Sequence, residues 1–333
     1  MGYTALVIWL QFLVAAAIVV FMANKLAEYG DIVAVRTGLG GLVIGTVLMA
    51  AATSLPELTG SVTSFRNGLP DLAAGNFFGS SMINMPILAV IDLVYRQTPI
   101  FRGAAISHAL TAALATLMTL IAVLTIVGEF DQAIGWVGIA SLVIIAVYFA
   151  GIWLLQRENH PDSAAVESAA DDFPSLRRGL IGFAVAAAVL IAVVPFLVEA
   201  TATIANDLGL SAGFAGMVLL SFVTSMPEML AAAAAIRLGS LDLAVGNLLG
   251  SSVFNMFGLA LADFFLTDGP FLNLIDPSFA LVGLLVILLT NLGLVANLAR
   301  SERRILFIEV DAVVILIVYV LGLYLLYQRG IGL

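Results

Sequence analysis

Apolar runs of about twenty residues follow one another along almost the whole chain. A helix rises about 1.5 Å per residue, so a run of this length crosses the hydrocarbon core of a bilayer. Outer-membrane barrel strands would instead give alternating segments of about ten residues. The pattern therefore predicts an all-α polytopic membrane protein with ten transmembrane helices. The expected spans are 4–22, 37–60, 72–94, 103–127, 133–155, 179–203, 210–235, 243–265, 277–298 and 308–328.

One block of polar and apolar positions occurs twice. Gly45–Asp92 and Gly216–Asp263 align without a gap at an offset of 171, and 22 of the 48 positions are identical. Apolar sequence can look self-similar because it is low in complexity, but embedded oxygen-bearing side chains do not repeat by accident. The repeated polar pairs are Thr53/Thr224, Ser54/Ser225, Glu57/Glu228, Asn76/Asn247, Ser80/Ser251, Ser81/Ser252 and Asn84/Asn255. This duplication predicts a two-fold site.

The two repeats divide the ten spans into two halves of five. An odd number of spans per half turns the second half over, so the halves are expected to be inverted repeats. We expect an N-terminal half, 1–156, and a C-terminal half, 179–333, joined by a polar linker, 157–178. The acidic residues of the linker lack EF-hand spacing, which favours a solvated connection over a regulatory calcium site.

Basic residues test the inversion independently. With ten spans, all but two of the 13 Lys and Arg residues fall on one side, the exceptions being Arg66 and Arg329. The positive-inside rule then places both termini outside the cell membrane and the linker 157–178 in the cytoplasm. Arg66 and Arg237 are equivalent in the two repeats and fall on opposite sides, as inversion requires. The N-terminal segment lacks the basic region of a signal peptide, so it is expected to remain as the first span.

Composition narrows the chemistry. Hydrophobic residues make up 62% of the chain, charged residues 11%, and the mean hydropathy is +1.13. There are no cysteines, which excludes disulfides and thiolate sites. The two histidines, His108 and His160, are too separated for a histidine metal site. No resident cofactor is expected.

Glu57 and Glu228 lie in the middle of apolar runs. A carboxylate at the bilayer centre costs several kcal/mol unless it is paired, hydrated or bound to a cation. No lysine or arginine lies at a matching depth, so a cation site is favoured over a buried salt bridge. Thr53 and Ser54 lie four and three residues before Glu57 and share its helix face if the segment stays helical.

A proline stands directly before each glutamate, Pro56 and Pro227. Each removes a backbone hydrogen bond about one turn upstream, which predicts broken helices in spans 2 and 7. A break at membrane depth is tolerated where it lines a cavity or an ion site. The carbonyls released at 50–52 and 221–223 are expected to turn inward as further ligands.

A polar stripe recurs at every fourth residue of spans 3 and 8. The stripes are Asn76, Ser80 and Asn84, and Asn247, Ser251 and Asn255. Glycines beside them are expected to let the broken helices approach closely. These glycines are Gly75, Gly79, Gly246 and Gly250. Four intramembrane asparagines beside two unpaired glutamates favour ion ligation over hydrogen bonding between helices alone.

Two further acidic pairs are repeated. Asp71 and Asp242 precede spans 3 and 8 and are predicted to be helix N-caps rather than ligands. Asp92 and Asp263 lie eight residues beyond Asn84 and Asn255, or about 12 Å along the helix, near the membrane edge. A role in supporting the site or in the ion pathway stays open.

All candidate ligands are oxygens, which indicates a hard cation. A flexible cage of six to eight oxygens suits Ca²⁺ better than Mg²⁺, which holds its waters tightly. Two carboxylates would neutralise one divalent ion. The same groups could bind monovalent ions or protons when Ca²⁺ is absent, which is the physical basis for exchange.

Two pairs of motifs carry a family resemblance. They are T-S-L-P-E at 53–57 with G-N-F-F-G-S-S-M-I-N at 75–84, and T-S-M-P-E with G-N-L-L-G-S-S-V-F-N at 246–255. They resemble the two alpha repeats of the calcium/cation antiporter superfamily, in particular its prokaryotic sodium/calcium exchanger branch. The resemblance implies alternating access, with spans 1 and 6 sliding across a core of the other eight. It also implies that Glu57 and Glu228 ligate Ca²⁺ and Na⁺. The further oxygens would come from Thr53, Thr224, Ser54, Ser225, Ser80 and Ser251.

The chain departs from the family pattern at two places. Glycine is usual before the Thr-Ser pair, where this chain has Ala52 and Val223. Sodium-coupled members typically carry Asp at the position of Asn255 and Asn at that of Asn84, whereas both are Asn here. We therefore expect an antiporter that exchanges Ca²⁺ for Na⁺ and extrudes Ca²⁺. Exchange of Ca²⁺ or another divalent cation for H⁺ at the same site is the alternative.

Two other classes of protein are less compatible with the sequence. A channel arranges its ligands around an axis along the membrane normal, unlike two inverted half-sites. A membrane enzyme would need a nucleophile and base or an aspartyl pair, and no such motif accompanies the glutamates. The predicted cation ligands are Glu57, Glu228, Asn84, Asn255, Thr53, Thr224, Ser54, Ser225, Ser80 and Ser251.

Overall fold

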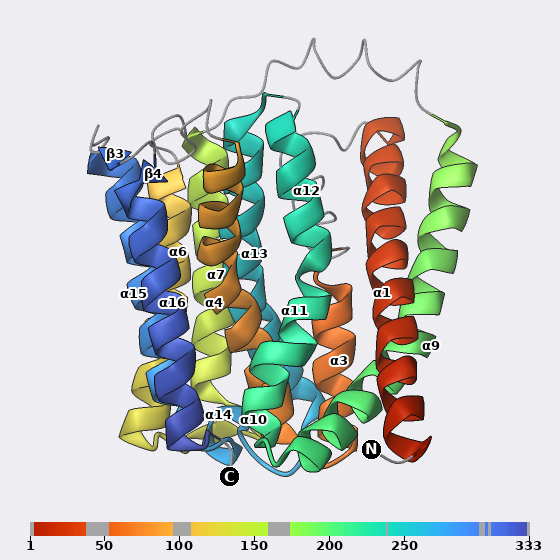
Figure 1. The fold of residues 1–333 in the computed structure, drawn as a ribbon, viewed down its shortest axis with the longest axis vertical. Coiled ribbons are helices and arrows are strands. Elements are labelled where there is room, and N and C mark those ends of the chain that lie inside the picture. Colours follow the sequence, from red (N-terminus) through yellow and green to blue (C-terminus); the bar gives the residue numbers. More distant parts are fainter. Residues whose placement is uncertain are drawn as a thin grey trace.

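A computed structural model describes residues 3–37, 53–95, 108–158, 174–237, 239–299, 304–305 and 308–331. These residues are almost entirely helical (Figure 1). The helices are α1 (Tyr3–Arg36), α3 (Leu55–Arg66), α4 (Pro70–Val94), α6 (His108–Gly128), α7 (Ile139–Glu158), α9 (Leu176–Leu208), α10 (Ala212–Ala215), the π-helix η2 (Gly216–Leu220), α11 (Ser221–Thr224), α12 (Met226–Arg237), α13 (Leu241–Ala262), the 3₁₀ helix η3 (Asp263–Phe265), α14 (Phe271–Leu274), α15 (Phe279–Ala299) and α16 (Val310–Arg329).

Two small antiparallel hairpins depart from the all-α prediction. They pair β1 (Ala133–Ile134) with β2 (Val137–Gly138), and β3 (Arg304–Ile305) with β4 (Ile308–Glu309). The first turns at Gly135, whose φ of 67° suits glycine because it has no Cβ. Both hairpins occur in connections just before long helices, so they leave the helical architecture unchanged.

Eight of the predicted spans are present among the described residues. Seven are single helices long and apolar enough to cross a bilayer, and the eighth is the bent run Ala212–Arg237. The fifth, α7, is apolar over the shorter stretch Ile139–Leu155. Of the second predicted span, 37–60, the part at 38–52 lies outside the described residues, and α3 forms its second half.

Helix α1 is longer than predicted, because it continues past Met22 to Arg36. The extension packs along α9, where glycines allow close contact. A Cβ on Gly179 would lie 2.8 Å from Ile32, and one on Gly182 would lie 2.5 Å from the Tyr29 ring. Packing against α9 therefore stabilises a segment whose polar residues had suggested the end of the span.

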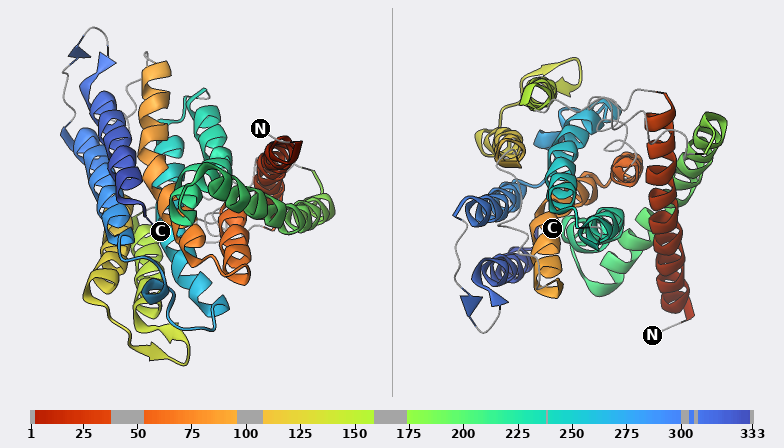
Figure 2. Two further views of the ribbon diagram at one scale, coloured as in Figure 1. Left: turned by 60° about the horizontal axis from the view of Figure 1, so that its bottom comes forward. Right: turned by 90° about the horizontal axis from the view of Figure 1, so that it is seen from above.

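Helices α4 and α13 form the centre of the protein, and α1 and α9 lie at its edge. In the most apolar 18-residue stretch of each helix, 78% of the residues of α4 and 72% of those of α13 are buried. The corresponding fractions are 17% for α1 and 28% for α9. Viewed from above, α1 and α9 stand together to one side of the other helices (Figure 2). The predicted division into a central core and a peripheral pair is consistent with this arrangement.

The two half-helices α3 and α12 run in opposite directions. A tight turn joins α3, which ends at Arg66, to the start of α4, with Leu69 N–H bonded to the Ser64 carbonyl (2.9 Å). Arg237, at the end of α12, instead donates to Tyr95 Oη (2.7 Å), just beyond the other end of α4. The 25 residues of α4 separate these ends by about 38 Å. The inverted relation of the repeats is confirmed.

The first turn of α1 and the last turn of α16 lie at the same end of the molecule, and α9 begins at the opposite end (Figure 1). This placement matches the prediction that both termini face one side and the linker the other. Most of that linker, 159–173, lies outside the described residues.

Candidate cation site

All ten predicted ligands are buried. Glu57, Glu228, Asn84 and Asn255 have no exposed surface, and the most exposed of the ten, Thr53, is only 6% exposed. They come from α3 and α12, which carry the glutamates, from α4 and α13, and from the residues at the helix breaks. Each half-helix contacts both α4 and α13, so the fold brings the two sequence repeats together.

The break in the seventh span lies at Ser225. There α11 and α12 meet at an angle of 43°. Ser225 has φ −89° and ψ −1°, and Ser54 in the first repeat has nearly the same backbone, φ −94° and ψ 9°. The predicted break is therefore confirmed in the second repeat. In the first, α3 starts afresh after Ser54, while the preceding residues 38–52 lie outside the described part.

Each glutamate lies in the first turn of its half-helix, Glu57 in α3 and Glu228 in α12. Free backbone N–H groups and the helix dipole favour negative charge at this position. Both side chains are fully buried. Among the described residues, neither forms an ion pair, so a bound cation is the natural counter-charge.

The carbonyls predicted as ligands are not all free. The Ser221 carbonyl accepts a helical hydrogen bond from Ser225 N–H (2.9 Å). The prediction that this carbonyl is released is therefore wrong for Ser221, because it keeps its ordinary helical partner. The corresponding residues 50–52 lie outside the described residues.

The first asparagine of each stripe forms a hydrogen bond with the backbone of a glutamate. Asn76 Nδ2 donates to the Glu57 carbonyl (3.2 Å), and Asn247 Nδ2 donates to the Glu228 carbonyl (3.2 Å). Thr224 Oγ1 in turn donates to Asn76 Oδ1 (3.1 Å), which links the two repeats. Sequence reasoning placed these asparagines in the stripes but missed this role, although their repetition was the available signal.

Hydroxyl groups continue the contact between repeats. Ser225 Oγ donates to Ser80 Oγ (2.7 Å), and Asn255 Nδ2 donates to the same oxygen (2.9 Å). Asn84 Nδ2 donates to Ser252 Oγ (2.9 Å), a residue that was not among the predicted ligands. Because the side-chain N–H groups of Asn84 and Asn255 donate to serines, their amide oxygens remain available as acceptors for another ligand.

Several buried side-chain oxygens of the predicted ligands are therefore left without a hydrogen-bond partner in the described part of the chain. Within the described residues, no hydrogen-bond partner reaches the following side-chain oxygens: both of Glu57, both of Glu228, Asn84 Oδ1, Asn255 Oδ1, Ser54 Oγ and Ser251 Oγ. Burying such oxygens is costly unless something binds them. The same residues contain no cluster of three or more His, Cys, Asp or Glu, so neutral oxygens would complete a shell around two carboxylates. This donor set fits a hard cation.

Small residues of α4 let the broken seventh span approach the site. A Cβ on Gly75 would collide with the Gly213 carbonyl, and one on Gly79 would lie 2.6 Å from the Met217 carbonyl oxygen. Met217 belongs to η2, a π-helix of the kind often found at functional sites. The predicted close approach is confirmed for Gly75 and Gly79. The corresponding residues of the first repeat, 42–46, lie outside the described part.

The prediction that Asp71 and Asp242 are N-caps is wrong. Both lie two residues past the cap position, inside the first turns of α4 and α13. Asp71 Oδ1 accepts from the backbone N–H of Asp276 (2.8 Å), and Asp242 Oδ1 lies 3.2 Å from His108 Nε2. Both helices start two residues earlier than expected, so these carboxylates contact neighbouring segments instead of capping their own helices.

Asp263 has a structural role that the sequence did not reveal. It is fully buried and accepts from the backbone N–H groups of Gly138 (2.9 Å) and Phe271 (2.7 Å). One carboxylate thus ties the end of α13 to β2 and α14. These partners lie 125 and 8 residues away in sequence.

Comparisons with known proteins agree with this architecture. The profile of the sodium/calcium exchanger protein family matches residues 7–155 and 178–328. Putative antiporter CaxA of Alkalimonas amylolytica is 25% identical over 323 residues, which cover 95% of this chain and 97% of CaxA. The H⁺/Ca²⁺ exchanger CAX has a similar fold, with a TM-score of 0.69, 13% identity, and coverage of 97% of this chain and 88% of that one. The sodium-calcium exchanger NCX_Mj gives a TM-score of 0.59 and 20% identity over 96% of this chain and 98% of its own.

Inverted helical repeats that enclose buried carboxylates define a multi-pass membrane antiporter of cations. The chain belongs to the sodium/calcium exchanger protein family, since the family profile covers both halves. The family resemblance and the antiporter class predicted from the repeated motifs are confirmed.

Proposed function

We propose that the protein exchanges Ca²⁺ for Na⁺ across the cell membrane by alternating access, with Glu57 and Glu228 as the central ligands. The observation that carries this proposal is the set of buried, donor-free oxygens at the meeting point of the two repeats. Two carboxylates balance the charge of one Ca²⁺. Several Na⁺ ions would use the same oxygens when Ca²⁺ has left.

Neutral oxygens would complete the coordination. We assign the amide oxygens of Asn84 and Asn255 to the shell because their N–H groups already donate to serines. The remaining oxygens are proposed to come from Thr53, Thr224, Ser54, Ser225 and Ser251. Ser80 Oγ accepts from Ser225 and Asn255, so it would join the shell only after one of these bonds is exchanged for the cation. Ca²⁺ accepts six to eight oxygens in flexible geometry, which this mixture of side chains can supply.

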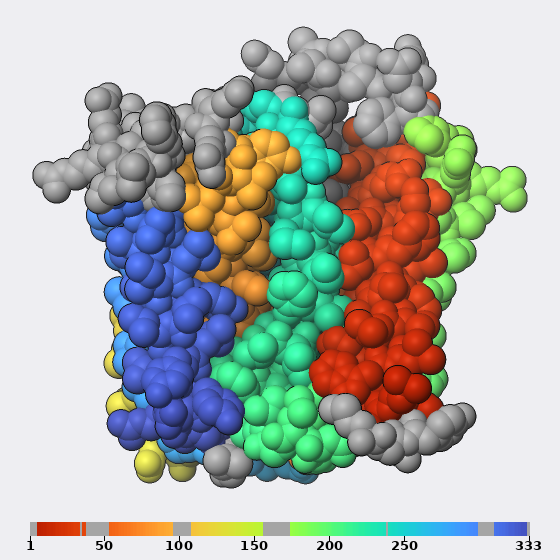
Figure 3. All heavy atoms as spheres, in the orientation of Figure 1, coloured from red at the N-terminus to blue at the C-terminus, as the bar shows by residue number. Residues whose placement is uncertain are grey.

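Access to the site requires motion, because both glutamates have no exposed surface. Helices α1 and α9 are the candidates for the moving part. They pack most extensively on each other, α1 contacts α3, α11 and α12, and α9 contacts α3 and η2. On the face shown in Figure 3, α1 lies alongside α11 and α12. Movement of this pair would expose the half-helices first to one side and then to the other.

We propose that residues 1–156 and 179–333 act as the two halves of a transporter without enzymatic activity. The linker at 157–178 would lie in the cytoplasm and both termini outside, as the distribution of Lys and Arg indicates. Under a normal inward sodium gradient, this protein would extrude Ca²⁺.

Exchange of Ca²⁺ for H⁺ is the second candidate. Asn84 and Asn255 are both amides, so the shell has two titratable groups rather than three. A site with fewer charges has less electrostatic attraction for several Na⁺ ions at once. Protons could instead neutralise Glu57 and Glu228 during the return step.

Transport by purified protein in liposomes separates these candidates. Uptake of radiolabelled Ca²⁺ would be measured under an imposed Na⁺ gradient, a pH gradient, or neither. We expect uptake under the Na⁺ gradient that saturates with Ca²⁺. Uptake driven only by the pH gradient would establish the second candidate, and non-saturating uptake without any counter-gradient would indicate a channel.

Matched substitutions test the site. Glu57→Gln and Glu228→Gln preserve shape but remove one charge each, and we expect uptake to fall at least roughly a hundredfold. Glu199→Gln is the control, because this carboxylate lies within the span of α9 but is exposed. If both buried variants transport at the rate of the control, the assignment of the site is wrong.

A further inference from the structure

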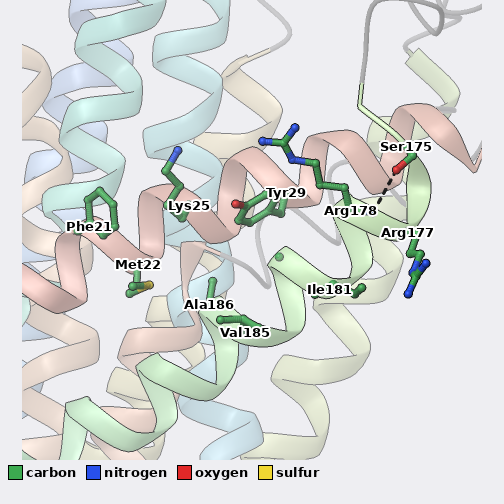
Figure 4. A pocket seen from close by; sticks show the side chains of 11 residues that line it. Phe21, Met22, Lys25, Tyr29, Ser175, Arg177, Arg178, Ile181, Val185 and Ala186 are labelled. Carbon is green, nitrogen blue, oxygen red and sulfur yellow. Dashed lines mark hydrogen bonds between the residues drawn. The ribbon is translucent and has the colours of Figure 1, made fainter.

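A basic cavity lies between α1 and α9, at the end of the molecule where α9 begins. Its volume is about 630 Å³, and its lining includes Lys25 and Tyr29 of α1 and Arg178 of α9 (Figure 4). Apolar side chains, among them Phe21, Ile181 and Val185, form the rest of the wall. We call this cavity the basic pocket. It is separate from the buried glutamates of the cation site.

Positive charge converges in the basic pocket. The Arg178 guanidinium extends past Tyr29 toward Lys25 (Figure 4). Glu28 pairs with Lys25 (2.5 Å) and offsets one of these charges. Arg177 adds a further cation to the lining but points away from Lys25 in Figure 4. A net positive charge therefore remains beside an apolar wall.

The backbone adds to this charge. Helix α9 starts at Leu176 with Ser175 as its N-cap, and Ser175 accepts from Arg178 N–H (3.4 Å). Backbone N–H groups at the start of a helix favour anions, phosphate groups in particular. Arginine and lysine are also the side chains that bind phosphate best. The chemistry of the pocket thus selects a phosphate group.

A second cavity of about 400 Å³ continues along the same two helices, lined by apolar residues and Gln11. Gln11 donates to the Phe196 carbonyl (3.0 Å), so its amide is already used. On α1, lining residues of both cavities recur every three or four positions along one face, whereas on α9 they form two groups, one ending at Ala186 and the other starting at Val193. On α1 they include Val7, Gln11, Val14, Ile18, Met22, Lys25 and Tyr29. On α9 they include Arg178, Gly182, Val185, Val193 and Phe196.

We propose that the basic pocket and the apolar cavity together, which we call the seam between α1 and α9, bind one anionic phospholipid of the bilayer. Its phosphate would lie between Lys25 and Arg178, and its acyl chains would follow the apolar cavity toward Val14 and Phe196. A lipid is favoured over a soluble phosphate because the seam joins a basic end to an apolar groove on the bilayer-facing edge of the protein. Such a lipid contacts both helices and holds α1 and α9 together as one unit, so membrane composition would regulate their movement.

Lys25 provides a direct test, since it is the only lysine in the chain. An uncharged amine-reactive reagent would therefore label one side chain, with the N-terminal amine as an internal reference. Full-length protein would be reconstituted in phosphatidylcholine vesicles, with or without phosphatidylglycerol. We expect phosphatidylglycerol to slow labelling of Lys25 relative to the N-terminus at least about tenfold.

Substitutions localise the effect. In Arg178→Gln, protection of Lys25 by phosphatidylglycerol should weaken about tenfold, whereas Arg66→Gln, at the other end of the molecule, should keep it. Thermal melting of each variant in detergent would check folding. Lipid retention measured by native mass spectrometry should fall in Arg178→Gln and in Lys25→Gln but not in Arg66→Gln. These readouts do not depend on which ions are transported.

Three outcomes would overturn the proposal. Equal labelling in both kinds of vesicle would show that no anionic lipid binds near Lys25. Protection by inorganic phosphate in pure phosphatidylcholine would assign the pocket to a soluble anion. Protection in every vesicle that disappears when Asp162, Glu167, Asp171 and Asp172 are changed to amides would assign it to the acidic linker.

Discussion

The side-chain amide of Asn76 donates a hydrogen bond to the backbone carbonyl of Glu57 at 3.2 Å. The second repeat copies this relationship at the same distance between Asn247 and Glu228. Each asparagine thus fixes the main chain from which a glutamate projects. Since Asn76 also accepts from Thr224, positioning of Glu57 depends on a residue of the opposite repeat.

Removal of this support should weaken cation binding. In Asn76→Ala the Glu57 backbone loses a buried hydrogen bond, a change of about 1 kcal/mol, so we expect apparent Ca²⁺ affinity in transport to fall roughly five- to tenfold. Asn291→Ala is the control, because the side chain of Asn291 in α15 also forms two hydrogen bonds, but with Thr116 and Ile287. An equal loss of affinity in both variants would contradict a specific role for Asn76.

Close packing at Gly79 should be intolerant of a methyl group. A Cβ there would lie 2.6 Å from the Met217 carbonyl oxygen, and backbone cannot move aside cheaply. We expect Gly79→Ala to destabilise the protein by about 1–3 kcal/mol and to displace η2. Thermal melting in detergent and Ca²⁺ uptake should both decrease.

Gly322→Ala serves as the matched control for this prediction. Its Cβ would meet only the side chain of Leu285, at 3.1 Å, which can rotate away. Melting should remain within about 0.5 kcal/mol of the original protein. Similar losses in the two variants would mean that the contact between α4 and η2 is not special.

Asp263 should be needed for stability rather than for ion binding. Asp263→Ala would leave the N–H groups of Gly138 and Phe271 buried without an acceptor, at a cost of about 1–3 kcal/mol each. We expect a lower melting temperature but an unchanged apparent Ca²⁺ affinity in the protein that remains folded. Asp268→Ala, at an exposed position of the following loop, should alter neither. A change in Ca²⁺ affinity without loss of stability would instead place Asp263 in the ion pathway.

An additional carboxylate in the site should strengthen cation binding. Asn255→Asp places a third negative charge beside Glu57 and Glu228, and Ser80 can reorient its hydroxyl to donate to the new carboxylate. Because ligand charge tunes Ca²⁺ affinity, we expect the Ca²⁺ concentration for half-maximal uptake to fall roughly tenfold. The fraction of uptake driven by Na⁺ should rise. Asn291→Asp adds the same charge outside the site, and an equal effect there would rule out a local cause.

Much of the fold was predictable because the membrane imposes strong rules on sequence. Span length, loop charge and the offset between repeats are each visible in a linear chain, and together they led to the inverted arrangement. Predictions about helix ends were weaker. Asp71 resembled a cap by its position, but the helix starts earlier, at Pro70, and the carboxylate bonds to Asp276 instead.

The candidate site, like the fold, could be predicted from the sequence only in part. Glu57 and Glu228 could be found without a structure, since a charged residue in an apolar span and a proline beside it are both local features. The use of Asn76 to hold the Glu57 backbone, and of Ser80 to accept from Asn255, could not. These bonds join residues 19 and 175 positions apart, and no sequence spacing encodes which of several polar groups will meet.

The sequence alone was sufficient to establish the membrane class, the duplication, the inversion and the identity of the buried carboxylates, because each depends on polarity at known depth. Only the tertiary structure decided which oxygens are consumed by hydrogen bonds and which are left as acceptors for an ion. It also decided that α1 and α9 pair at the edge of the molecule and enclose a basic seam. Both results depend on the packing of helices distant in sequence, where a shift of one turn would exchange every partner.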